Sequence, residues 1–69
     1  MSQFKIEISS VPDKEKLVAE IWYNDIMIAE INQETKELLI EFFVAENISF
    51  PLDDFLKILE IAKSKLLPK

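Results

Sequence analysis

The sequence predicts an α+β domain in which a four-stranded antiparallel β-meander is followed by one C-terminal amphipathic helix packed on one face (ββββα). Three observations support this fold class. Four successive segments alternate apolar and polar side chains, which is typical of strands with two different faces. The last segment repeats its apolar residues every three or four positions, as a helix does. Strands that precede a single helix in the chain favour a sheet covered on one side.

The length and composition predict a single domain over residues 1–69. Hydrophobic residues make up 49% of the 69 positions, which is enough to order a small core. The chain has no Cys and no His, so disulfides and the usual zinc ligand sets are excluded. The fold must therefore be stabilised by side-chain packing.

The first expected strand is followed by a polar loop. Phe4, Ile6 and Ile8 alternate with polar side chains, which predicts a strand with one buried face. Residues 9–16 contain a proline and a run of four charged residues. Turn-forming and charged residues in succession predict a solvated loop.

The second and third strands are expected at residues 17–23 and 26–31, joined as a hairpin. Asn24 and Asp25 are the two loop residues, and Asn tolerates the positive φ of a type I′ turn. The expected facing pairs are Tyr23 with Ile26, Trp22 with Met27 and Ile21 with Ile28. Glu20, Glu30 and Glu41 are also expected to share one face of the sheet.

The fourth strand is expected at residues 38–44, and the helix follows Pro51. Proline suits the first turn of a helix, where its missing N–H has no helical acceptor. Acidic residues near the helix start and lysines near its end complement the helix dipole. The apolar positions of this helix are Leu52, Phe55, Leu56, Leu59, Ala62 and Leu66.

The residue inventory argues against catalysis and against nucleic-acid binding. Without His, Cys or Gly, the chain lacks the usual general bases, thiol nucleophiles and phosphate-binding loops. We therefore expect no catalytic residues, no cofactor and no metal. The net charge is −5, and all eight basic residues are lysines, so we expect no direct contact with a phosphate backbone. The sequence contains no signal-peptide pattern and no apolar run long enough for a membrane span, which favours a cytoplasmic protein.

Large apolar residues on both faces of the sheet point to protein binding. One helix can cover only one face of the sheet. Alternation places large apolar residues on both faces, with Ile21, Ile28 and Phe42 on one and Trp22, Met27 and Phe43 on the other. Aromatic residues and Met are enriched in interface cores. The uncovered face is expected to bind a different protein. A homodimer interface and ordinary scattered apolar surface are the alternatives.

Three stretches of the chain resemble a family of short bacterial proteins. The stretches are residues 17–23 (LVAEIWY), residues 28–34 (IAEINQE) and residues 52–56 (LDDFL) before the closing helix. They are similar to the small immunity proteins of contact-dependent and other polymorphic toxin systems. Those relatives commonly have Gly in the hairpin turn, where this chain has Asn24 and Asp25.

The resemblance implies an immunity protein that binds a cognate toxin domain, often a nuclease, and blocks its active site or substrate path. An acidic inhibitor suits a basic toxin domain. From surface chemistry, the candidate contacts are three apolar anchors and four charged residues: Trp22, Tyr23, Met27, Glu20, Asp25, Glu30 and Glu41. Two alternatives stay open, namely an acidic nucleic-acid mimic that inhibits a host defence protein, and a homodimeric structural or assembly module.

Overall fold

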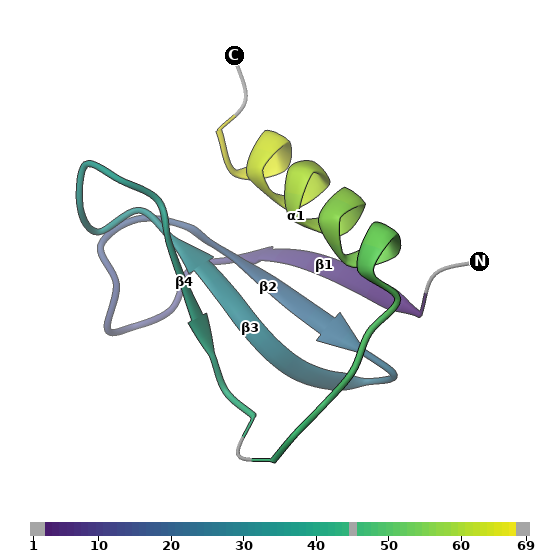
Figure 1. Cartoon of the computed structure of the whole chain (residues 1–69). Helices are drawn as coiled ribbons and strands as arrows, with labels where there is room; N and C mark the ends of the chain where they lie inside the picture. Colours follow the sequence, from purple (N-terminus) through teal and green to yellow (C-terminus); the bar gives the residue numbers. More distant parts are fainter. Residues whose placement is uncertain (1–2, 45, 68–69) are drawn as a thin grey trace.

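The computed structural model describes residues 3–44 and 46–67 and has the predicted ββββα architecture (Figure 1). The elements are β1 (Phe4–Ser9), β2 (Val18–Tyr23), β3 (Ile26–Asn32), β4 (Leu39–Phe42) and α1 (Leu52–Leu66). The four strands form one antiparallel sheet in the order β1-β2-β3-β4, and α1 packs on one face of it. The predicted fold class is confirmed. The fourth strand is shorter than the predicted range 38–44.

The β2–β3 hairpin closes through the predicted two-residue turn. Asn24 and Asp25 have φ angles of 50° and 68°, and a type I′ turn requires positive φ at both positions. The pairs Tyr23–Ile26 and Trp22–Met27 are confirmed. The predicted pair Ile21–Ile28 is wrong, because the register shifts between Ile21 and Trp22 and places Ala29 opposite Ile21. A β-bulge of this kind adds one residue to one strand and changes the parity beyond it.

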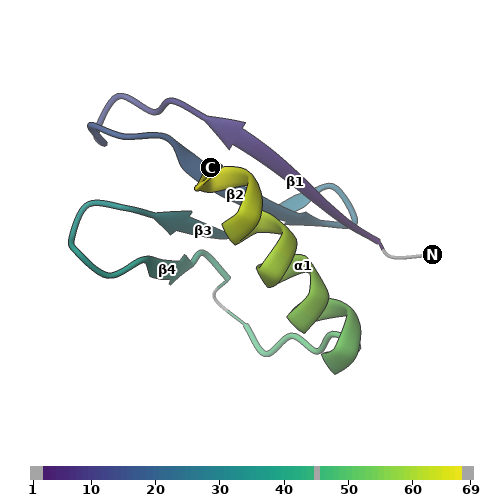
Figure 2. The same cartoon turned by 90° about the horizontal axis from the view of Figure 1, so that it is seen from above.

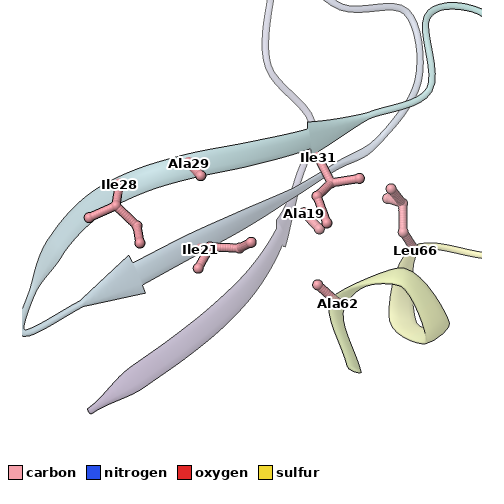
Figure 3. Close-up of a cluster of buried hydrophobic side chains, with 7 residues drawn as sticks. All are labelled: Ala19, Ile21, Ile28, Ala29, Ile31, Ala62 and Leu66. Atoms are coloured by element: carbon pink, nitrogen blue, oxygen red, sulfur yellow. The ribbon is translucent and has the colours of Figure 1, made fainter. Parts of the chain in front are cut away.

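The hydrophobic core lies between α1 and the face of the sheet that we call the inner face (Figure 3). Its centre is built from Ala19, Ile21, Ala29, Ala62 and Leu66. Small alanine side chains on β2, β3 and α1 allow the helix to approach the sheet closely. The other two members of the cluster are Ile28 and Ile31.

Four aromatic rings fill the space between β1, β2 and the start of α1. Phe50 stacks on Phe55 with ring centroids 5.2 Å apart, and Phe4 and Tyr23 lie 4.7 Å apart. Phe50 also contacts Tyr23 edge-on at 4.8 Å. Aromatic contacts of this geometry add about 0.5–1.5 kcal/mol each beyond their buried area. The cluster fixes the position where the chain enters the helix.

The helix begins directly after Pro51, so the proline precedes the first turn instead of lying within it. Asp53 and Asp54 lie in the first turn, and Lys63 and Lys65 in the last, as the dipole argument predicts. Leu67 extends the last turn, because its backbone N–H donates to the carbonyl of Lys63 at 3.0 Å.

The helix covers only part of the inner face. It contacts β1 and β2, while β4 lies beside the helix when the molecule is seen from above (Figure 2). Ile40 and Phe42 point to the inner face, since they pair with Ile31 and Ala29, yet both are exposed. A groove lined by Leu38, Ile40, Leu59, Glu60 and Lys63 separates β4 from the helix.

Candidate functional site

A row of four glutamates crosses the face of the sheet opposite α1, which we call the outer face. The register places Glu7 opposite Glu20, Glu20 opposite Glu30, and Glu30 opposite Glu41. Strands lie about 4.8 Å apart, so the row spans roughly 14 Å. The prediction that Glu20, Glu30 and Glu41 share a face is confirmed, and Glu7 completes the row.

Like charges directly opposite each other destabilise a sheet, so the row needs cations. Lys5 on β1 lies 3.5 Å from the carboxylate of Glu7. Lys14 lies in the loop between β1 and β2. Its Nζ atom is 3.7 Å from Glu30 Oε2 and 3.7 Å from Glu41 Oε1. Two lysines therefore offset part of the repulsion along the row.

Lys14 is an exception in the segment 9–16, most of which is exposed as predicted. Its side chain is only 17% exposed, and it also lies 3.6 Å from Asp13. Burial alone would lower the pKa of Lys14, but the carboxylates of Asp13, Glu30 and Glu41 raise it further than burial lowers it. The net effect is a pKa above the ordinary value of 10.5, so the ammonium stays charged at neutral pH.

We expect the interaction of Lys14 with the glutamate row to be lost in alkali. A lysine whose pKa is raised by folding contributes stability that is complete below its unfolded pKa and is lost as pH rises through the folded value. The wild-type protein should therefore lose stability above about pH 10.5. Lys14→Met should be less stable at neutral pH, and its stability should fall less over the alkaline range. Urea unfolding across a pH series measures both effects, and parallel curves for the two proteins would contradict this role.

Glu30 occupies the buried centre of the row. Its side chain is 8% exposed, and among the described residues Oε2 has no hydrogen-bond partner. The Lys14 ammonium at 3.7 Å is too distant for a hydrogen bond but close enough for charge pairing. A buried carboxylate without full hydrogen bonding costs stability.

Trp22 links two strands of the outer face. Its indole Nε1 donates to Glu20 Oε1 at 3.3 Å, and Lys5 Nζ lies 5.4 Å from the ring centroid. Met27 pairs with Trp22 across the hairpin, so the two side chains share this face. Both are half-buried. An aromatic ring with a carboxylate at its edge and an ammonium over its face combines apolar contact with charge recognition.

Asn32 fixes the other end of the row. Its Nδ2 donates to Glu41 Oε1 at 3.0 Å, and its Oδ1 accepts from the backbone N–H of Glu34 at 3.3 Å. Glu41 itself remains half exposed at 50%. The carboxylate is held in place and still faces solvent.

The structure brings five of the seven candidate contacts onto the outer face: Glu20, Trp22, Met27, Glu30 and Glu41. Tyr23 lies on the inner side, in the aromatic cluster with Phe4 and Phe50. Asp25 is exposed at the hairpin tip, away from the row, and Glu30 is buried. Sequence reasoning missed Glu7, Lys5, Lys14 and Asn32. Alternation places Glu7 and Lys5 on one strand face, whereas no local pattern indicates that the loop carries Lys14 back over the sheet.

Within residues 3–44 and 46–67, no group of three or more His, Cys, Asp or Glu side chains is arranged to hold a metal ion. In the same part of the chain, no helix has the length and apolar character needed to cross a membrane. The outer face presents carboxylates and an aromatic side chain on a pleated surface.

Comparison of the chain with protein-family models, curated proteins and solved structures found no match.

Proposed function

We propose that this protein is an immunity-type inhibitor that binds a basic toxin domain through its outer face and occludes the active site or substrate path of that domain. The observation that carries the proposal is the carboxylate row with Trp22 and Met27 beside it. Glu7 and Glu41 are each about half exposed, and Glu41 is held by Asn32. Prepositioned carboxylates lose little side-chain entropy when a basic surface binds them.

The net charge of −5 supports fast association with a positively charged domain. A nuclease is the kind of toxin that fits best, because its substrate channel is already lined with basic side chains for phosphate. The resemblance of residues 17–23, 28–34 and 52–56 to immunity proteins points to the same class of partner.

The partial neutralisation of the row favours this function over nucleic-acid mimicry. A mimic needs free carboxylates at successive phosphate positions, whereas Lys5 and Lys14 already pair with Glu7, Glu30 and Glu41. Carboxylates around an aromatic ring and a methionine are better suited to a protein surface with its own apolar centre.

Affinity capture with charge variants tests the proposal. We expect tagged wild-type protein to recover one basic domain from cells of its source, in equal amount, and to suppress the activity of that domain. Glu20→Gln/Glu41→Gln should reduce recovery at least about tenfold, since two charge-assisted contacts of about 1.5–3 kcal/mol each are lost.

The matched control is Glu46→Gln/Asp53→Asn, which removes the same charge from exposed positions off the outer face. It should recover the domain as the wild type does. Equal losses in both variants would show that only net charge matters, and recovery of no other protein would overturn the proposal.

A further inference from the structure

The flank of α1 that faces β4 has a self-complementary sequence. Leu56, Glu60 and Lys63 on α1 are spaced by four and three residues, so at about 100° per residue they lie along one side of the helix. Leu67, the residue directly after α1, is four residues beyond Lys63 and continues this side through the bond of its N–H to the Lys63 carbonyl. Glu60 and Lys63 line the groove beside β4, which identifies the direction of this flank. Leu56 and Leu67 are 51% and 45% exposed.

The spacing of these four residues is the same in both directions along the chain. If a second α1 lies antiparallel against this flank, Leu56 meets Leu67 of the second copy, and Glu60 meets Lys63 of the second copy. Both contacts then occur twice, as a two-fold axis requires. An arbitrary helix from another protein would not match this order of apolar, acidic, basic and apolar positions.

We propose that two copies of this chain form a symmetric dimer in which their α1 helices pack antiparallel along Leu56, Glu60, Lys63 and Leu67. The second helix then lies on the side of α1 where β4 is uncovered. Ile40 and Phe42, which are exposed on the inner face, are the sheet residues placed to contact it. The apolar surface that α1 leaves uncovered is thereby removed from water.

The charge distribution also favours a second copy on this side. Two chains of net charge −5 repel each other, and most strongly if their glutamate rows meet. The flank carries one acid and one base, so it is locally neutral and pairs with itself. The acidic outer faces remain free in the dimer, and the inference does not depend on the proposed function.

Sedimentation equilibrium of the untagged full chain, over a range of concentrations, tests the dimer. We expect the wild type to be dimeric and Leu56→Glu to raise the dissociation constant at least about tenfold, because a carboxylate would face an apolar side chain. Ile61→Glu is the matched control. Ile61 is 46% exposed but lies about 140° around the helix from Leu56, so this change should leave the dissociation constant unaltered.

Charge exchange tests the antiparallel order. Glu60→Lys places two lysines together, and Lys63→Glu places two glutamates together, so each variant alone should dimerise more weakly than the wild type. Mixed together, the two variants form complementary pairs and should recover dimerisation as a heterodimer. A wild-type monomer at every concentration would overturn the proposal, as would equal effects of Leu56→Glu and Ile61→Glu or a mixture that stays monomeric.

Discussion

Ile21→Ala should lower the free energy of unfolding by about 2–5 kcal/mol, the range measured for removing a large aliphatic side chain from a core. Ile21 is fully buried, and it lies on β2 at the centre of the sheet beneath α1 (Figure 3). The neighbouring Ala19 and Ala29 are already small, so nearby side chains cannot readily fill the space. The lost contacts and the cavity both destabilise the fold.

This loss is large for a domain of this size. At about 0.05–0.15 kcal/mol per residue, a 69-residue chain has a total stability of roughly 3–10 kcal/mol. Urea unfolding at one fixed protein concentration measures the change. Ile61→Ala serves as the control, since Ile61 is exposed on α1 and should change stability by less than about 0.5 kcal/mol. Equal effects of the two substitutions would show that the core is not centred on Ile21.

Glu30→Met should raise the free energy of unfolding by about 1–2 kcal/mol, within the gain seen when buried ionic groups are replaced by apolar ones. The substitution removes a carboxylate whose Oε2 is buried without a hydrogen bond. It also removes the repulsion of Glu30 by Glu20 and Glu41 on either side. Lys14 keeps two partners, Asp13 and Glu41, so its ammonium is not left unpaired.

Glu41→Met is the control for this second prediction. Glu41 belongs to the same row but is half exposed, so its carboxylate pays little desolvation cost in the folded protein. Replacing it therefore relieves little cost, and the hydrogen bond from Asn32 is lost. We expect Glu41→Met to lower the free energy of unfolding by about 1–3 kcal/mol, because Nδ2 of the buried Asn32 loses its acceptor. A Glu30→Met protein that is less stable than the wild type would contradict the account of Glu30 as a residue that costs stability. A higher free energy of unfolding for Glu30→Met would indicate that the protein keeps Glu30 for a reason other than stability.

The fold could be predicted from the sequence because each element is indicated by a pattern of residues that are close together in the chain. The helix from Leu52 to Leu66 follows from its apolar period, and the hairpin follows from Asn24 and Asp25 between two alternating segments. The error at Ile21 has a physical cause. A bulge changes the parity of β3 by one residue, and alternation alone gives no indication of it.

The candidate site was predictable only where its residues lie on strands. Alternation from the hairpin turn places Glu20, Trp22 and Met27 on a common face. Glu30 joins that face only because the bulge shifts the parity of β3, and Glu41 follows through its pairing with Glu30. Whether Glu30 and Tyr23 are exposed to a partner depends on which other segments of the chain pack against them. Lys14 reaches over Glu30 from a loop, and Phe50 packs on Tyr23 from the segment before α1. Contacts between segments so distant in sequence are decided by the tertiary fold, not by a local pattern.

Carboxylate footprinting of the complex with the captured partner tests the central claim most directly. In this measurement, exposed Asp and Glu side chains are chemically labelled with and without the partner, and the label at each position is quantified by mass spectrometry. The account predicts that Glu7, Glu20 and Glu41 are protected in the complex, while Glu46 and Asp53 are labelled as in the free protein. Protection of Asp53 with full labelling of Glu20 and Glu41 would place the partner on the opposite side of the molecule and contradict the assignment of the outer face.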